Sequence, residues 1–231
     1  MLFDNDLAAA VQYFERALQL ETVNPDIVRR AAKLLASIGR LKEAIALAEF
    51  GVANDPVDAA IHSNLAWFYS SADRWDEAIT TYNTTLKLSP GYGIAQYAIG
   101  VALLFKGEPQ AALEAMQQVA SHWRLMGLSM VYHALGRATE SDAALADLIA
   151  QHERNAAYNI AYIFAYRRES DRAFEWLDKA VEYKDPGLSY ILYEPLFANI
   201  RDDPRWLPFL KSIGKSPEQL ATIEFNVTLP E

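Results

Sequence analysis

The stretch AAIHSNLAWFYSSADRWDEAITTYNTTLKLSPGY, residues 59–92, contains two helical segments joined by a short polar segment. In the polar segment, the serines and Asp73 compete for backbone hydrogen bonds, which favours a turn. Pro90 cannot continue a helix and marks the end of the second segment. Ala66 and Ala78 are small enough to let two antiparallel helices cross closely. The stretch therefore predicts a helix-turn-helix hairpin.

The small residue near the start of the second helix recurs along the chain at a fixed interval. Ala10, Ala44, Ala78 and Ala112 follow one another with a constant spacing of 34 residues. A constant period of this length is typical of repeat proteins, in which each hairpin buries its apolar face against the next. The spacing therefore predicts one continuous array of stacked hairpins.

The hairpin resembles a tetratricopeptide repeat, whose pattern is W-x2-L-G-x2-Y, then A-x3-F, then P. The matching positions are His62, Leu65, Ala66, Tyr69, Ala78, Tyr82 and Pro90. His62 departs from the pattern, because an aromatic residue is usual at that position. The resemblance implies an all-α fold, a right-handed α-solenoid of tetratricopeptide helix-turn-helix repeats with a C-terminal helical cap. The resemblance specifies the fold much better than the function.

The repeat register divides the chain into three parts. Residues 1–24 are expected to hold the second helix of a truncated repeat, and residues 188–231 the C-terminal capping helices and a tail that lies extended on the surface. The five repeats or repeat-like copies between them are 25–58, 59–92, 93–121, 122–153 and 154–187. The copy at 122–153 is degenerate, because Ser141 replaces the small alanine.

Both ends of the chain suggest a larger context. A second helix without its first would expose an apolar face, so we expect either a longer parent protein or a homodimer through the N-terminal half-repeat. The segments AFEWLDKAVEYKDPGL (173–188) and RDDPRW (201–206) resemble the tails of bacterial multidomain signalling proteins. That resemblance implies an array attached to an effector domain.

Composition narrows the classes of partner. Of the 231 residues, 52% are hydrophobic and 22% are charged, which is enough apolar material for a folded chain. A formal net charge of −9 opposes binding to nucleic acid, whose affinity depends on Lys and Arg. The absence of cysteine excludes disulfides and thiolate chemistry. We expect a protein or peptide partner and no nucleic acid.

No segment predicts membrane insertion. The longest apolar run, Ile94 to Phe105, is shorter than the ~20 residues that span a bilayer. No signal peptide is visible. The expected location is the cytoplasm, with the periplasm as the alternative.

The first helices of stacked hairpins are expected to line a concave groove that accepts a peptide or helix. Arg29 and Lys33 lie four residues apart, where their repulsion costs about 0.2–0.5 kcal/mol and an acidic segment would relieve it. The aromatic and methionine side chains suit an apolar partner. The candidate partner-binding residues are Arg29, Arg30, Lys33, Asn64, Trp67, Tyr97, Trp123, Met126, Met130, His133, Tyr158, Asn159, Tyr162 and Tyr166.

Alternatives to the groove interpretation remain at each of these positions. The basic residues could be neutralised by carboxylates such as Asp26 and by solvent. The aromatic residues could form the core between helices. A carboxylate clamp of the chaperone-binding type is rejected, because Lys33 and Ala98 occupy positions where that clamp needs an asparagine and a cation.

Catalysis is not predicted. The four histidines show no metal-binding spacing, and no phosphate-binding loop or nucleophile motif is present. We therefore predict a non-enzymatic scaffold without a cofactor or metal. The alternative is a sensory or self-association segment that regulates an attached effector domain.

Overall fold

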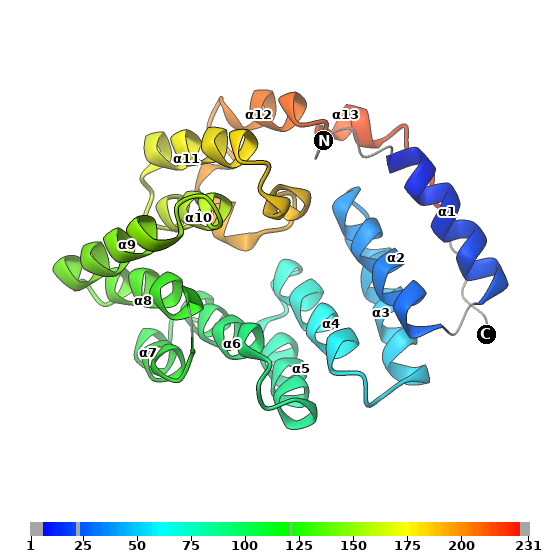
Figure 1. The fold of residues 1–231 in the computed structure, drawn as a ribbon, viewed down its shortest axis with the longest axis horizontal. Coiled ribbons are helices and arrows are strands. Elements are labelled where there is room, and N and C mark those ends of the chain that lie inside the picture. The colour runs from blue at the N-terminus through cyan, green and yellow to red at the C-terminus, as the bar shows by residue number, and fades with distance from the viewer. Residues whose placement is uncertain (1–6, 22–23, 121, 227–231) are drawn as a thin grey trace. The chain divides into compact units, whose positions relative to one another are not determined.

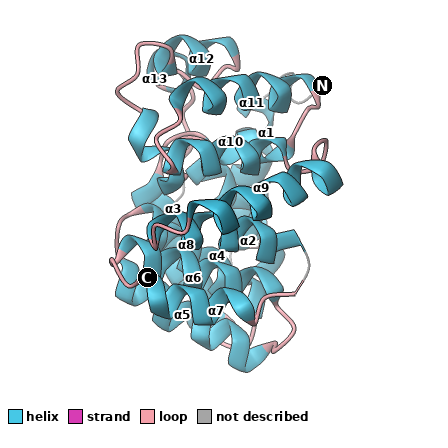
Figure 2. Ribbon diagram, turned by 90° about the vertical axis from the view of Figure 1, so that its left-hand side faces the viewer, coloured by secondary structure: helices cyan, strands magenta, loops and turns pink. Residues whose placement is uncertain are grey.

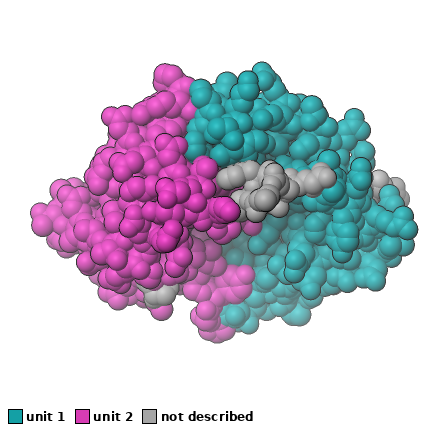
Figure 3. All heavy atoms as spheres, turned by 45° about the horizontal axis from the view of Figure 1, so that its top comes forward, with its two compact units in different colours: residues 1–89, 207–231 teal, residues 90–206 magenta. Residues whose placement is uncertain are grey.

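The computed structural model describes residues 7–21, 24–120 and 122–226. Every regular element in these ranges is a helix, and no β-strand occurs in them (Figures 1 and 2). The chain forms two compact units, coloured in Figure 3. Unit 1 comprises residues 1–89 and 207–231, and unit 2 comprises residues 90–206. The predicted all-α class is confirmed.

Unit 1 contains one single helix followed by two hairpins. Its helices are α1 (Leu7–Leu20), α2 (Pro25–Ser37), α3 (Leu41–Asn54), α4 (Ala59–Ser71), α5 (Trp75–Leu88) and α13 (Pro217–Leu220). Within the hairpins, α2 packs on α3 and α4 packs on α5, and α3 also packs on α4. Asn24 and Asp58 cap α2 and α4 by accepting hydrogen bonds from backbone N–H groups of the first turn.

Unit 2 contains three hairpins and two short 3₁₀ helices. Its elements are α6 (Gly93–Phe105), α7 (Pro109–Gln117), α8 (His122–Ala134), α9 (Ala138–His152), α10 (Ala157–Tyr166), α11 (Ser170–Glu182), η1 (Pro186–Tyr190) and η2 (Pro195–Ile200). The helix α12 (Trp206–Ser212) begins at the last residue of this unit. The helices α6, α8 and α10 form one layer, in which α8 contacts both of the others.

The 34-residue period corresponds to one structural position. Ala10, Ala44, Ala78 and Ala112 are each the fourth residue of their helices, α1, α3, α5 and α7. The last three are completely buried, with 0% exposure. A larger side chain at this position would push the two helices of a hairpin apart. The predicted repeat of stacked hairpins is confirmed.

The turns inside the hairpins share a conformation that the sequence pattern does not show directly. Each turn has three residues, and the middle one has a positive φ: Gly39, Asp73, Gly107, Gly136 and Arg168. Glycine adopts this conformation without steric cost, whereas a residue with a Cβ is strained in it. The aspartate and the arginine therefore hold a strained backbone at positions where glycine serves in the other three turns.

Ser141 replaces the alanine of the repeat pattern, and its contacts give a physical reason for the replacement. Ser141 is the fourth residue of α9 and is completely buried, like the alanines. Its hydroxyl donates to the carbonyl of Ser129 and accepts from Nη2 of Arg167 at 2.7 Å. Arg167 is buried and also pairs with Asp142 at 2.5 Å. The serine is thus the buried hydrogen-bond acceptor of an arginine.

The C-terminal segment differs from the predicted cap. The part before residue 207 does pack on the preceding hairpin, where the Phe197 ring lies 5.4 Å from the ring of Tyr158 and 5.6 Å from that of Trp206. Residues 207–226, however, belong to unit 1. Phe225 is buried, whereas Glu224 and Asn226 on either side of it are exposed. The expectation for residues 227–231 lies outside the described residues.

The same segment packs on the first hairpin and contacts the N-terminal half-repeat at Glu15. The expected longer parent protein or homodimer partner for that half-repeat stays a prediction. The Arg40 guanidinium donates to the carbonyls of Ile223 and Phe225 at 2.9 and 2.8 Å. Lys215 Nζ donates to the carbonyl of Ser37 at 2.7 Å, and burial lowers the pKa of this lysine to about 8. The backbone N–H of Asn226 donates to the Glu15 carboxylate. These carbonyls and N–H groups belong to the backbone, so the sequence pattern contained no signal for the contact.

We predict that Ser141→Ala destabilises the protein, although it restores the alanine of the repeat pattern. Arg167 would lose a buried acceptor, at a cost of about 1–3 kcal/mol in the free energy of unfolding measured with urea. The double variant Ser141→Ala with Arg167→Met removes both partners and should recover most of that loss. A stabilised Ser141→Ala variant would contradict the role given to this hydrogen bond.

Candidate functional site

The predicted partner-binding residues all come from the first helices of the hairpins. In unit 1 these helices are α2 and α4, which contact each other. In unit 2 they are α6, α8 and α10. The structure therefore brings the predicted residues together within each unit, but it divides them into side chains that reach the surface and side chains that belong to the core.

The basic residues of α2 form a cluster that its neighbours neutralise only in part. Arg29 pairs with Asp26 at 2.5 Å, which holds the pKa of that carboxyl below its ordinary value. Lys33 is half-buried, and within the described residues neither it nor Arg30 has a carboxylate within ion-pair distance. Burial, followed by repulsion from Arg29 and Arg30, lowers the pKa of Lys33. An anion beside Lys33 would relieve both effects.

The neighbouring helix α4 contributes an amide and an aromatic ring. The Nδ2 atom of Asn64 is buried and makes no hydrogen bond within the described part of the chain. A buried donor without an acceptor is costly, and a ligand that supplied an oxygen would remove the cost. Trp67 is partly exposed, with its ring 5.2 Å from that of Phe68. The face of α2 and α4 thus combines positive charge, an unused donor and an aromatic surface.

Five of the predicted partner-binding residues in unit 2 are core residues. They are Tyr97, Met126, Met130, Tyr158 and Tyr162, each at most 6% exposed. A partner on the surface does not reach them, because neighbouring helices already cover them. Periodicity on the first helices could not separate these side chains from surface ones, since both kinds recur at the same helical spacing.

The buried tyrosines form a polar cluster inside the core. The hydroxyls of Tyr97 and Tyr162 are 2.8 Å apart, and Asn159 Nδ2 donates to the Tyr162 hydroxyl at 2.9 Å. The Tyr158 hydroxyl is buried without a hydrogen bond to any described residue. Burial raises the pKa of all three tyrosines, so their hydroxyls stay protonated. Asn159 is partly exposed and connects this cluster to the surface.

Glu194, which the sequence analysis did not single out, faces the same cluster. Its carboxylate caps η2 by accepting from the Leu196 N–H at 3.3 Å, and its carbonyl accepts from Arg201 at 3.0 Å. Burial raises the pKa of this carboxyl from 4.5 to about 7. Its charge in turn raises the pKa of Tyr162 and Tyr158. The only signal in the sequence is the order Glu-Pro, which is typical of a capped helix start.

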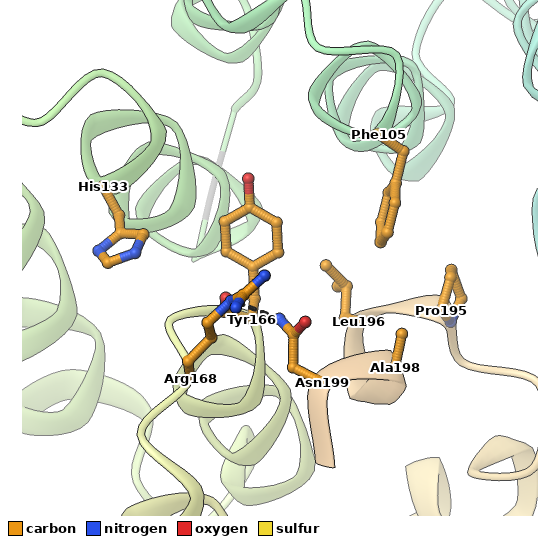
Figure 4. Close-up of a pocket in the computed structure, with 8 residues that line it drawn as sticks. All are labelled: Phe105, His133, Tyr166, Arg168, Pro195, Leu196, Ala198 and Asn199. Carbon is orange, nitrogen blue, oxygen red and sulfur yellow. Dashed lines mark hydrogen bonds between the residues drawn. The ribbon is translucent and has the colours of Figure 1, made fainter. Parts of the chain in front are cut away.

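A pocket of about 310 Å³ opens beside this cluster in unit 2 (Figure 4). Its lining residues are Phe105, His133, Tyr166, Arg168, Pro195, Leu196, Ala198 and Asn199. His133 and Tyr166 were predicted to bind a partner, whereas the other six were not. Phe105 is the last residue of α6, and Arg168 lies in the turn after α10. The other four belong to η2, which lies outside the repeat pattern.

Trp123 is the remaining predicted residue of unit 2, and it lies in an aromatic row. Its ring is 5.2 Å from that of Tyr97 and 4.9 Å from that of His122, which in turn lies 5.2 Å from the ring of His152. Burial, followed by the neighbouring His152, lowers the pKa of His122. Trp123 is partly exposed and can contribute to a binding surface.

Among the described residues, no three His, Asp or Glu side chains gather as a metal site would require. In the same residues, no helix is both long and apolar enough to cross a bilayer. The polar groups described above are donors, cations and protonated hydroxyls, which suit binding through hydrogen bonds and charge.

Two tetratricopeptide-repeat family models match the sequence, one over residues 4–67 and the other over residues 64–124. Together they span just over half of the 231 residues. No curated protein matches the sequence.

Solved structures share the fold. A tetratricopeptide repeat protein from Parabacteroides merdae has a TM-score of 0.57 at 19% identity, covering 94% of this chain and 91% of that one. MamA has a TM-score of 0.53 at 21% identity, covering 66% and 86%. YrrB, described as a TPR protein with an unusual peptide-binding site, has a TM-score of 0.49 at 22% identity, covering 78% and 96%. At these identities the similarity to the first two structures shows the fold alone.

We predict that Glu194 makes the protein less stable as pH rises from about 5 to 7. The carboxyl binds its proton more tightly in the folded state, where its pKa is about 7, than in the unfolded state. Its contribution to the free energy of unfolding is therefore fully present below the pKa of the unfolded state. This contribution is lost as pH rises through the pKa of the folded state. Because the group is partly exposed, the loss should be about 1–2 kcal/mol, less than the full shift would give.

The measurement is the free energy of unfolding by urea at several pH values between 5 and 8. Glu194→Gln should remove this part of the pH dependence and raise stability at pH 8. Glu114→Gln changes an exposed glutamate of the same unit and should leave the pH profile as it is. An unchanged profile in Glu194→Gln would show that this carboxyl is not the group responsible.

Proposed function

This chain belongs to the tetratricopeptide-repeat family, and on that premise we propose that it is a non-catalytic scaffold for protein–protein interaction. The partner segment, a peptide or a helix, binds across the first helices of the hairpins. In unit 1 the binding face is formed by α2 and α4, and the preferred partner is an acidic segment.

The observation that carries this proposal is the charge around Lys33. Three cations lie within one face of α2, and only Arg29 has a carboxylate partner. Arg30 and the half-buried Lys33 thus lack a carboxylate partner among the described residues, although the chain as a whole has a net charge of −9. A carboxylate bound beside Lys33 would restore the charge balance that burial and repulsion disturb.

Two further groups on α4 support a polypeptide as the occupant. Asn64 has a buried amide donor that a backbone carbonyl of a peptide can satisfy. Trp67 offers a partly exposed aromatic surface of the kind that anchors side chains at interfaces. Within unit 2, the partly exposed Trp123, Asn159 and Tyr166 on α8 and α10 offer groups of the same kind.

The scaffold acts as part of a larger signalling protein in this proposal. The support is the resemblance of residues 173–188 and 201–206 to the ends of bacterial multidomain signalling proteins. The array would then bring an attached effector domain to its target in the cytoplasm.

Self-association is a second candidate function, and exposed apolar residues on α1 favour it. Tyr13 and Leu20 are 68% and 73% exposed, whereas Val11 and Leu18 of the same helix are buried. A second copy of the chain that covered this side of α1 would form a homodimer, and a sensory role would follow if a ligand controlled its formation.

For the acidic segment, we predict that Arg29→Glu with Lys33→Glu weakens peptide binding at least about tenfold, because repulsion replaces attraction. The probe is a fluorescein-labelled peptide with six glutamates, compared with the same peptide carrying glutamines, and the readout is fluorescence anisotropy. The glutamate peptide should bind more tightly, and added salt should weaken it.

The control is Lys42→Glu with Lys87→Glu, which makes the same charge change at exposed positions on the second helices of unit 1. This variant should bind nearly as well as the natural chain. Equal losses in both double variants would mean that the peptide responds only to net charge, and no loss in either would remove α2 as the binding site.

For self-association, we predict that the molar mass measured by light scattering rises with protein concentration. Tyr13→Glu with Leu20→Glu should keep the chain monomeric, because burying the new charges would be unfavourable. Val57→Glu, at an apolar residue that is 72% exposed elsewhere in unit 1, should leave the association unchanged. A constant monomer mass for the natural chain would exclude this candidate.

A further inference from the structure

The pocket of unit 2 has walls that the structure holds in place. Asn199 Nδ2 donates to the carbonyls of Ala165 and Tyr166 at 3.2 and 3.1 Å, which ties η2 to the end of α10. Phe197, in the middle of η2, is completely buried. The Glu194 cap secures the start of the same helix. A short 3₁₀ helix outside the repeats thus forms one fixed side of the cavity.

One side of the pocket is apolar. Phe105, Leu196 and Pro195 lie together on one side of Tyr166, as Figure 4 shows. The rings of Phe105 and Tyr166 meet edge to face, with centroids 6.3 Å apart. Both rings are only partly covered, so they offer area to a ligand. A ring or a branched aliphatic group would bury that area.

The other side of the pocket offers donors. His133 lies across Tyr166 from Phe105 (Figure 4), and Arg168 also lines the pocket. Within the described residues, no carboxylate pairs with Arg168, in contrast to Arg167, which pairs with Asp142 and Glu169. None of the eight lining residues is acidic. In a chain with a net charge of −9, this lining selects a negative group.

Arg168 also occupies a position that normally suits glycine. Its φ is +64°, and glycine stands at the equivalent place in three of the other hairpin turns. The strain that a Cβ causes in this conformation is of the order of 1 kcal/mol. Strained residues of this kind gather at functional sites, where the side chain is needed. Here the side chain is the only permanent positive charge of the pocket.

We propose that this pocket binds a carboxylate attached to a bulky apolar group, with the carboxylate on Arg168 and the apolar group against Phe105 and Tyr166. A guanidinium presents two parallel N–H donors that match the two oxygens of a carboxylate. The site lies entirely within unit 2 and does not depend on the acidic-segment site of unit 1.

A monoanion fits the charge of the pocket better than a phosphate does. His133 adds little charge at neutral pH, because burial, followed by the nearby Arg167, lowers its pKa. One permanent cation matches one negative charge. The volume of about 310 Å³ is at the lower end for small-ligand pockets and suits a single aromatic or branched residue. Two sources share this chemistry: the C-terminal residue of a polypeptide and a small free carboxylic acid.

The test is an NMR titration of the whole ¹⁵N-labelled chain. The two ligands compared are N-acetyl-L-phenylalanine and its uncharged amide. The acid should shift the Asn199 side-chain amide and the backbone amide of Arg168, with saturation in the millimolar range. The amide should bind at least about tenfold more weakly, because it loses the charged hydrogen bonds. N-acetylglycine, which keeps the carboxylate without the ring, should also bind at least about tenfold more weakly.

Arg168→Gly removes the guanidinium while relaxing the turn, so the fold is retained. The affinity of Arg168→Gly for N-acetyl-L-phenylalanine should be no higher than the affinity of the natural chain for the uncharged amide. Asp73→Gly makes the same kind of change in the equivalent turn of unit 1, where φ is +58°, and should leave binding unaltered. The backbone amide spectra of both variants report whether the fold is intact.

A tetrapeptide, Gly-Ser-Gly-Phe with a free C-terminus, distinguishes the two sources. Tighter binding than that of N-acetyl-L-phenylalanine assigns the pocket to a polypeptide C-terminus, and equal or weaker binding assigns it to a small free acid. Equal affinities for the acid and the amide, unchanged binding by Arg168→Gly, or shifts confined to residues away from the pocket would overturn the proposal.

Discussion

The close crossing of two helices at one small residue in every 34 is the constraint on which the rest of the structure depends. At the fourth position of α3, α5 and α7 an alanine without exposed surface sets the distance between the helices of each hairpin. That distance decides which side chains of the first helix are enclosed and which remain at the surface. The three-residue turns, each with one residue at positive φ, then return the chain at the angle that this packing requires.

In the hairpin of α8 and α9, the alanine at this position is replaced by a serine that makes polar contacts. Ser141 occupies the alanine position of α9 and ties its own hairpin to Arg167 at the end of α10. Arg167 and Arg168 are neighbours in the sequence with opposite roles. The first is buried and paired, while the second is exposed and lines the pocket. A buried cation is stable only with acceptors around it, so Arg167 determines the identity of Ser141 more strongly than the repeat pattern does.

The binding surfaces follow from the same geometry. First-helix residues that point toward neighbouring helices, such as Tyr97, Tyr162 and Met126, form the core of unit 2. Residues on the same helices that lie one turn or less from these core residues, such as Trp123 and His133, reach the surface. Helical periodicity identifies a face about 100° wide, but burial changes within that face according to how closely the next helix approaches. For this reason the sequence pattern did not separate the exposed residues of these helices from the buried ones.

The sequence by itself determined the all-helical class, the period and the charge cluster of α2, because each of these depends on residues close together in the chain. Only the tertiary structure decided where residues 207–226 pack, which tyrosines are buried, and that η2 completes a pocket with α10. The contacts that hold the C-terminal segment use backbone carbonyls of Ser37, Ile223 and Phe225, which every residue possesses. No side-chain pattern records such contacts, since their selectivity comes from the position of the backbone in space.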